Sequence, residues 1–308
     1  MTAIRVAIVG LGKIARDQHI PAISDTDGIE LAAIADPHAS MDGIAHFATL
    51  DELLAAKHPI DAVALCTPPQ TRRALAASAL RAGKHVLLEK PPGATVSELA
   101  PLIAVARQGG RTLFAAWHSR FAPAVEPARA FLGERQIKSV VVEWKEDVRV
   151  WHPGQAWIWE PGGFGVFDPG INALSIMTRI LPRPFFVTEA ELSFPRNRAA
   201  PIAADLTFAD ETGLPIRAEF DWRQTGTQTW DIRIETEAGR LTLASGGRRL
   251  LHDDRTVVDE QKAEYRAIYR HFIELIANGV SDVDLSPLAH VADAFMLGRR
   301  RDVEPFED

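Results

Sequence analysis

Short apolar runs alternate with helical patterns over the first part of the chain. The runs contain mostly Val, Ile, Leu and Ala and barely alternate with polar residues, which is typical of parallel strands buried on both faces. We expect strands at Ile4 to Val9, Leu31 to Ala35, Ala62 to Cys66, His85 to Glu89 and Thr112 to Ala116, with helices at Leu50 to Lys57, Thr71 to Ala82 and Val96 to Gln108. This rhythm predicts a doubly wound α/β domain over residues 1–118.

Beyond His118 the rhythm changes to longer, alternating segments. In the segment around Phe220, apolar residues alternate with charged ones, which predicts a sheet with one buried and one polar face. We expect helices at Ala122 to Leu132, Gly170 to Leu181, Glu264 to Ala277 and Pro287 to Arg299, a strand at Lys138 to Val148, and successive strands from Phe185 to Leu251. Residues 119–308 are therefore predicted to form an α+β domain on an open, mainly antiparallel sheet.

Composition narrows the classes of function. The chain has 308 residues, of which 46% are hydrophobic, enough for the cores of two domains. The formal net charge of −7 argues against a nucleic-acid surface, which needs a basic face. Arg299, Arg300 and Arg301 form one basic cluster, but acids follow at once, so we interpret it as a solvated helix end.

The location of the protein is predicted from what its sequence lacks. Cys66 is the only cysteine, so no intramolecular disulfide forms, which fits a reducing compartment. Residues Met1 to Arg5 lead directly into a strand pattern without the features of a signal peptide. No uncharged apolar run approaches the ~20 residues of a membrane helix. We therefore expect a cytoplasmic protein with no membrane partner.

A glycine pattern follows the first predicted strand. Gly10, Gly12 and Ala15 give G-x-G-x-x-A, in which the first glycine allows a tight turn, the second lets the backbone approach a pyrophosphate, and the alanine lets helix and strand pack closely. The N-terminus of the following helix offers free N–H groups to the phosphates. The position between a strand and a helix favours a dinucleotide site over a purely structural glycine turn.

Asp36 stands at the end of the second predicted strand, about 20 residues after the glycines. A carboxylate at that place can bind the ribose hydroxyls of the adenosine and repels a 2′-phosphate. No Arg follows directly. We therefore predict NAD as the preferred cofactor, with use of NADP as the alternative. If Asp36 has no role in cofactor binding, it is an ordinary acidic residue at the end of a strand.

At Glu89-Lys90-Pro91-Pro92 the chain resembles the Gfo/Idh/MocA oxidoreductases, and the resemblance extends over essentially all residues. Thr67-Pro68-Pro69 and the stretch from Gly162 to Asn172 support it. The resemblance implies a Rossmann domain followed by an open sheet that often mediates oligomerisation, hence a homo-oligomer. It also implies cofactor contacts from Gly10, Gly12, Lys13, Ile14, Asp36, Thr67, Pro68, Glu89 and Lys90.

Within that family, three stretches are similar to the bacterial aldose 1-dehydrogenases that oxidise L-arabinose or D-galactose. They are Gly12 to His19, Trp144 to Val148 and Trp151 to Gln155. This similarity implies oxidation of the anomeric carbon of a galacto-configured sugar, such as L-arabinose, D-galactose or D-fucose, to its lactone with NAD(P). It also places His118 and Trp230 in the sugar site.

Two positions depart from the family pattern. Many members carry a His, often taken as the catalytic acid/base, where this chain has Asn172. An amide does not titrate, so the proton-transfer role must fall on another residue. The family often has Asn where Pro69 stands, so a cofactor contact there is lost or replaced.

Sugar oxidation needs a group that removes the hydroxyl proton. Lys90 closes a parallel strand at the edge where such sheets bind ligands, and the resemblance makes it catalytic. Asp168 is the candidate base, and Asn172, four residues on, shares its helix face and is assigned to a sugar hydroxyl. The alternative is a helix N-cap at Asp168, before Pro169 at the first helical position; one side chain can serve both roles, although a carboxylate held by N–H groups is a weaker base.

Four tryptophans fall within sixteen residues, from Trp144 to Trp159. Sugars pack their C–H faces on indoles and need polar partners at the rim. We assign Trp151 and His152 to the sugar pocket with Glu146 as a hydroxyl acceptor, and the other tryptophans to the core or a subunit interface. No compact metal-ligand motif is present, so we predict no metal.

Two other functions remain open on the sequence. An inositol or other polyol dehydrogenase is the nearer one, although Asn172 in place of His weighs against it. A non-catalytic sugar or dinucleotide sensor is the other; Lys90 and Asp168 favour catalysis over it.

Overall fold

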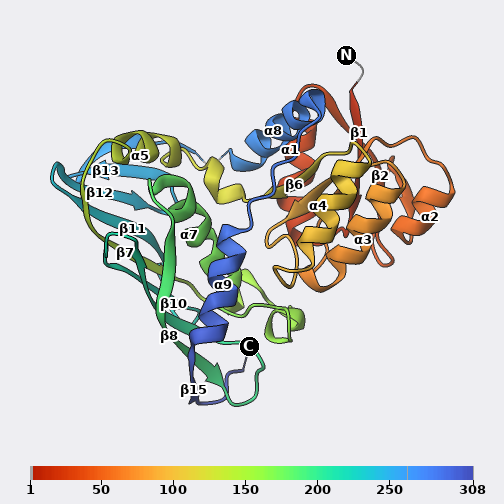
Figure 1. The fold of residues 1–308 in the computed structure, drawn as a ribbon. Helices are drawn as coiled ribbons and strands as arrows, with labels where there is room; N and C mark the ends of the chain where they lie inside the picture. The colour runs from red at the N-terminus through yellow and green to blue at the C-terminus, as the bar shows by residue number, and fades with distance from the viewer. Residues whose placement is uncertain (1–2, 262, 308) are drawn as a thin grey trace. The chain divides into compact units, whose positions relative to one another are not determined.

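A computed structural model describes residues 3–261 and 263–307. Within them the strands form two sheets, and the chain divides into two compact units (Figure 1). The first unit contains residues 3–118 and 263–284, and the second contains residues 119–261 and 285–307. The structure thus divides the chain differently from the prediction of one break at residue 118, because the chain returns to the first unit after residue 262.

The first unit is built on a six-stranded parallel sheet with the order β3-β2-β1-β4-β5-β6. Its strands are β1 (Ile4–Val9), β2 (Ile29–Ala35), β3 (Ala45–Phe47), β4 (Ala62–Leu65), β5 (His85–Glu89) and β6 (Leu113–Ala116). The predicted doubly wound sheet is confirmed. The order reverses between β1 and β4, and in such sheets ligands bind at the carboxyl ends of the strands beside this reversal.

Helices cover both faces of this sheet. They are η1 (Ala15–His19), α1 (Ile20–Ser24), α2 (Leu50–Ala55), α3 (Pro69–Arg81), α4 (Leu99–Gln108) and α8 (Glu264–Asn278). Right-handed crossovers that run in opposite directions from the centre place α1 on one face and α3 on the other. The returning helix α8 packs on α1 (Figure 1), and its Phe272 stacks on Phe114 of β6 with ring centroids 6.2 Å apart.

The second unit is built on a nine-stranded mixed sheet with the order β14-β13-β12-β11-β7-β10-β9-β8-β15. Its strands are β7 (Ile137–Lys145), β8 (Phe185–Pro195), β9 (Ala203–Asp210), β10 (Ile216–Asp221), β11 (Thr229–Thr236), β12 (Gly239–Ala244), β13 (Arg249–His252), β14 (Arg255–Asp259) and β15 (Arg299–Val303). Most neighbours are antiparallel, as predicted. The pairs β7–β10 and β8–β15 are parallel.

One face of the second sheet is covered by helices. The helices of this unit are η2 (His118–Phe121), which begins on the last residue of the first unit, α5 (Val125–Leu132), α6 (Val148–Trp151), η3 (Ala156–Trp159), α7 (Phe167–Ile180) and α9 (Ser286–Leu297). Helices α5, α7 and α9 pack against the sheet and each other (Figure 1). In β10, Ile216, Ala218 and Phe220 are buried while Arg217 and Glu219 are exposed, so the predicted alternation is confirmed.

Two predictions about this unit were wrong. The cluster Arg299 to Arg301 is not a helix end: α9 ends at Leu297, Gly298 has extended backbone, and the arginines form the edge strand β15 beside β8. Their charges are solvated, and Arg301 contacts Glu191. The strand predicted up to Val148 ends at Lys145, because Asp147 caps the short helix α6 by accepting the N–H of Arg149.

No helix among the described residues is both long and apolar enough to span a bilayer.

Candidate active site

The glycine turn after β1 has the geometry that its sequence predicts. Gly10 has a φ of +90°, and a Cβ built there would lie 2.9 Å from the Cγ2 of Thr67, so a side chain fits neither the backbone nor the space. A Cβ at Gly12 would meet no heavy atom within 4 Å. Helical backbone begins at Lys13 and continues through η1 into α1. An open glycine before a helix start is what a pyrophosphate requires.

Asp36 follows β2 and is tied to the glycine turn. Its Oδ2 accepts the N–H of Leu11 at 2.7 Å, and its Oδ1 accepts the N–H groups of His38 and Ala39. Burial alone would raise the pKa of this carboxyl, but the three N–H donors hold it below the usual 3.8. The side chain is therefore an anion at neutral pH, beside the turn and partly exposed.

The other predicted cofactor residues of the first unit lie around this turn. Thr67 contacts Gly10 and, with its Oγ1, accepts a hydrogen bond from Thr71. Pro68 is the N-cap of α3. Lys13 is exposed and forms an ion pair with Asp17, and Ile14 is partly exposed one residue after it.

Glu89 and Lys90 stand at the carboxyl end of β5. Lys90 is partly exposed, and its backbone N–H donates to the Oε2 of Glu89 at 2.6 Å. The Glu89 carboxylate is only 2% exposed and is directed into the protein, toward His19 and Tyr265. Because this carboxylate is enclosed by protein groups, a cofactor contact from Glu89 stays a prediction.

His118 is held within the first unit by α8. Its Nδ1 lies 2.8 Å from the Oε2 of Glu264, and its ring stacks on Tyr265 with centroids 5.5 Å apart. Helix α8 thus orients a residue predicted to contact the sugar. Sequence reasoning did not connect these residues, because Glu264 lies 146 positions away.

In the second unit, Glu146 forms the centre of a cluster of aromatic residues. It follows β7 and is 4% exposed. The Nε1 of Trp222 donates to one carboxylate oxygen at 3.2 Å, and the Nε1 of Trp230 donates to the other at 2.8 Å. Trp151 packs edge-on against Trp230 with centroids 5.3 Å apart and remains exposed. An exposed indole beside a carboxylate oriented by two indole N–H groups is a typical environment for a sugar.

The cluster continues from Trp222 to Asp168. The His152 ring lies 5.3 Å from that of Trp222, and its Nε2 lies 3.3 Å from the Oδ2 of Asp168. Asp168 is 3% exposed. Asn172 lies one helical turn later on α7 and is partly exposed, so the structure supports the predicted shared helix face.

The alternative reading of Asp168 as a helix N-cap is wrong. Helix α7 begins at Phe167 after the N-cap Val166, so Asp168 lies inside the first turn. Its own N–H donates to the carbonyl of Gly165 at 2.8 Å. Asp168 therefore has a partner of a different kind, the imidazole of His152.

The structure also sorts the tryptophans. Trp144 and Trp159 are buried, as predicted for core positions. Trp222 was not predicted as a site residue, although it connects Glu146 to His152. Its signal was present, since it continues the alternation of β10, but alternation alone marks a core position and gives no chemistry.

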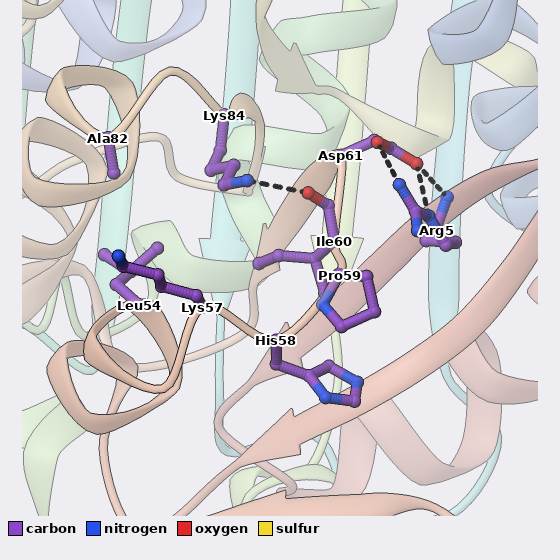
Figure 2. Close-up of a pocket in the computed structure, with 9 residues that line it drawn as sticks. All are labelled: Arg5, Leu54, Lys57, His58, Pro59, Ile60, Asp61, Ala82 and Lys84. Atoms are coloured by element: carbon purple, nitrogen blue, oxygen red, sulfur yellow. Dashed lines mark hydrogen bonds and ion pairs between the residues drawn. The ribbon is translucent and has the colours of Figure 1, made fainter.

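A separate cavity of about 380 Å³ lies at the amino-terminal ends of the strands of the first sheet (Figure 2). Arg5 near the start of β1, Asp61 before β4 and Lys84 before β5 contribute to its wall. The strands are parallel, so this edge is opposite the one that carries Gly10 and Lys90. Among the described residues, no group of three or more His, Cys, Asp or Glu side chains is arranged to hold a metal ion.

Comparisons with known proteins agree with the cofactor turn. Residues 4–116 match the model of an oxidoreductase family, GFO_IDH_MocA, described as having an NAD-binding Rossmann fold. Over 308 residues, all of both chains, the sequence is 47% identical to a galactose 1-dehydrogenase of Pseudomonas fluorescens. The chain belongs to this family. The resemblance that the Glu89-Lys90-Pro91-Pro92 motif indicated is therefore confirmed.

Solved structures extend the agreement to the whole fold. A D-galactose-1-dehydrogenase protein from Rhizobium etli is 59% identical, with a TM-score of 0.95 over 100% of this chain and 99% of that one. The 3-ketoreductase KijD10 of Actinomadura kijaniata, solved with NADP and TDP-benzene, has a TM-score of 0.84 at 20% identity, covering 98% of this chain and 100% of that one. The second likeness shows the fold alone.

Proposed function

We propose that the protein is an aldose 1-dehydrogenase that oxidises the anomeric carbon of a galacto-configured sugar to its lactone. The observation that carries this proposal is the full-length similarity to two galactose 1-dehydrogenases, at 47% and 59% identity. The cluster around Glu146 supports it, because it offers an oriented carboxylate and an exposed indole.

A bound nicotinamide supplies the acceptor for the hydride that leaves the sugar carbon. The chain's own residues must then bind the sugar and take its hydroxyl proton. We assign the proton to Asp168, whose contact with His152 orients the carboxylate. Lys90 hydrogen-bonds the reacting oxygen as a cation, and Asn172 binds a neighbouring hydroxyl as an amide. We assign to Glu146 a hydrogen bond accepted from a sugar hydroxyl.

The substrate range that we propose is D-galactose, L-arabinose and D-fucose. These sugars share their ring stereochemistry and differ at the exocyclic carbon. A group of about one methylene changes discrimination by only ~1–3 kcal/mol, so one pocket accepts all three.

The test is a steady-state assay of the purified protein with NAD and a panel that adds D-glucose and myo-inositol. We expect cofactor reduction with the three galacto-configured sugars and a lactone that hydroxylamine traps as the hydroxamate. Turnover with inositols alone would favour a polyol dehydrogenase. Tight NAD binding without turnover of any sugar would favour a sensor.

We propose NAD as the preferred cofactor, because the anionic Asp36 lies beside the glycine turn. Replacing Asp36 with Ser removes the charge that repels a 2′-phosphate. We expect the ratio of kcat/KM for NADP to that for NAD to rise about tenfold or more, the effect of removing ~1.4 kcal/mol of repulsion. A wild-type enzyme that prefers NADP would contradict the assignment.

A further inference from the structure

A network of buried polar groups lies behind the carboxyl end of β5, and the roles proposed above leave it unused. The Nε2 of His19 lies 3.1 Å from the Oε1 of Glu89, and the hydroxyl of Tyr265 donates to the same oxygen at 2.6 Å. The Nδ1 of His19 lies 2.7 Å from the hydroxyl of Tyr269. His19 and Tyr269 are completely buried. All four residues belong to the first unit, which α8 joins from the distant part of the chain.

The network ends on the backbone of Lys90. Oε2 of Glu89 is not shared with His19 or Tyr265; it accepts the N–H of Lys90 at 2.6 Å. On the other side, the buried guanidinium of Arg72 donates to the carbonyls of Glu89 and Pro91. The peptide group that joins Glu89 to Lys90 and the one that follows Pro91 are therefore both held by buried, charged side chains.

The side chains of Glu89 and His19 in this network favour opposite charges. Burial opposes ionisation of Glu89, but hydrogen bonds from His19 and Tyr265 and the positive charges of His19 and His118 outweigh it and lower its pKa to about 2. Burial would also lower the pKa of His19, yet its contacts with Cys66, Tyr269 and Glu89 raise it well above 6.5. Glu89 is therefore a buried carboxylate at neutral pH, and the raised pKa of His19 favours the charged form of its partner.

A buried ion pair is weak evidence for stability, because apolar residues of the same volume are often equally good or better. What such a pair provides is fixed geometry, since each charged group has one low-energy arrangement with its partners. Here the fixed arrangement ends on the residue assigned to the reacting oxygen.

We propose that Glu89, His19 and Tyr265 form a positioning network that sets the backbone of Lys90 and, through it, the place of the ammonium group. The proposal rests on the proposed function in taking Lys90 as catalytic. The three residues act through Lys90 and touch neither substrate nor cofactor. Helix α8 becomes part of the catalytic apparatus, because it supplies the hydroxyl that completes the Glu89 carboxylate.

The test compares Glu89→Gln and Tyr265→Phe with a control, Asp61→Asn. Gln keeps the shape of Glu89 but loses the charge, and Phe removes only the hydroxyl of Tyr265. Asp61 is the matched control because its carboxylate binds Arg5 through several hydrogen bonds at the opposite edge of the same sheet (Figure 2). For each protein we would measure Tm, kcat, and KM for NAD and D-galactose.

We expect Glu89→Gln to lower kcat by about 10–100-fold, as for a lost hydrogen bond to a charged group, while both KM values change less than about threefold. Tyr265→Phe should lower kcat by about 3–10-fold and report on the network even if Glu89→Gln folds poorly. Asp61→Asn should lower Tm and leave kcat unchanged. A lower Tm in all three variants with an unchanged kcat in each would overturn the proposal. The network would then contribute to stability alone.

A second readout separates this proposal from the proposed function. Peptide mass spectrometry gives the rate at which an acylating reagent modifies Lys90. This rate depends on the position and surroundings of the Lys90 amine and requires no turnover. We expect Glu89→Gln and Tyr265→Phe to change that rate several-fold relative to wild type and to leave the rate at Lys57 as it was. If wild-type protein oxidises no sugar, the proposed function fails, and the Lys90 rates alone decide the network: an unchanged rate rejects it.

Discussion

At the scale of single residues, the chemistry rests on what surrounds each carboxylate of the second unit. Asp168 and Glu146 are both almost fully buried, but their partners differ. Glu146 accepts hydrogen bonds from two indole N–H groups, which are neutral donors that do not release a proton in the pH range in which proteins are folded. Asp168 instead contacts the imidazole of His152, a side chain that can donate or accept a proton. This difference makes Asp168 the better candidate for moving a proton.

Replacing Asp168 with Asn should lower kcat by about 10²–10⁴, the usual contribution of general acid–base catalysis, because an amide cannot accept the proton. KM for the sugar should change much less, since the amide still binds a hydroxyl. Steady-state kinetics with NAD and D-galactose measure both. Asp210→Asn is the control, a buried carboxylate of the same unit with no proposed role in the reaction; near-wild-type kcat for Asp168→Asn would move the base role to Lys90 or a water.

Replacing Lys90 with Ala should abolish turnover while NADH still binds with nearly unchanged affinity. The ammonium acts on the reacting oxygen in our proposal, and the glycine turn, which holds the pyrophosphate, is not altered. Fluorescence titration with NADH gives the affinity, and the absorbance of reduced cofactor gives the rate. Residual kcat above about a hundredth of wild type would show that this residue is not essential to the chemistry.

The structure brings together those predicted site residues that cluster along the chain. Glu146, Trp151, His152 and Asp168 lie within one short stretch, and the structure connects them. Their connector, Trp222, comes from a strand much further along. The partners of His19 and Glu89 lie 250 and 176 positions away on α8. Periodicity indicates that such residues are buried, but pairing over that separation depends on tertiary packing, which no local pattern contains.

At the scale of elements, strands with a clear hydrophobic pattern were predicted from the sequence, and strands that are short or lack such a pattern were not. The buried parallel strands and the alternating strand β10 agree with their patterns. Strands β3, of three residues, and β15, an arginine-rich edge, have too little apolar sequence to show a period. The turn between β9 and β10 follows local sequence closely, since the residues Asp210 to Gly213 that join the two strands include the Asp and Gly typical of turns.

That turn is organised by one buried carboxylate. Oδ1 of Asp210 accepts hydrogen bonds from the N–H and hydroxyl of Thr212 and from the N–H of Leu214, and Oδ2 pairs with Arg183 at 2.6 Å. Burial alone would raise the pKa of Asp210, but these donors together hold it far below the usual 3.8. A depressed pKa contributes stability above the unfolded value of 3.8, and that stability is lost as the pH falls below it.

Asp210→Asn should therefore lower the free energy of unfolding at neutral pH by about 2–3 kcal/mol, because a charged acceptor with several donors is lost. The difference between wild type and variant should shrink as the pH falls below 3.8. Urea unfolding across this range, followed by fluorescence, measures it. Thr212→Ala, which removes a single donor, should show a smaller loss; a difference that does not depend on pH would mean that the carboxylate charge contributes nothing.

At the scale of the whole molecule, the sheet of the second unit has exposed apolar side chains on one face. Val141, which is 39% exposed, lies on β7 with Arg217 and Arg233 as its cross-strand neighbours, and Phe186 on β8 is 51% exposed. Exposed apolar side chains flanked by charges are common at subunit interfaces. We propose that this face joins copies of the chain into a homo-oligomer.

Light scattering coupled to size exclusion should show a dimer or tetramer for the wild type. Val141→Glu places a charge among the cross-strand neighbours and should shift the distribution toward smaller species. Val280→Glu, a similarly exposed valine that follows α8 in the first unit, is the matched control and should leave the mass unchanged. A monomeric wild-type protein would reject the proposal.

The return of the chain to its first unit has a consequence for how the protein is made. During translation, residues 3–118 leave the ribosome well before Tyr265 and Tyr269 exist, so the nascent Rossmann sheet holds His19 and Glu89 without the phenols that complete them. Synthesis that stops early would release a fragment with an incompletely paired charge in its interior, an easy substrate for proteases. The first unit is therefore finished only when nearly all of the second unit has been synthesised.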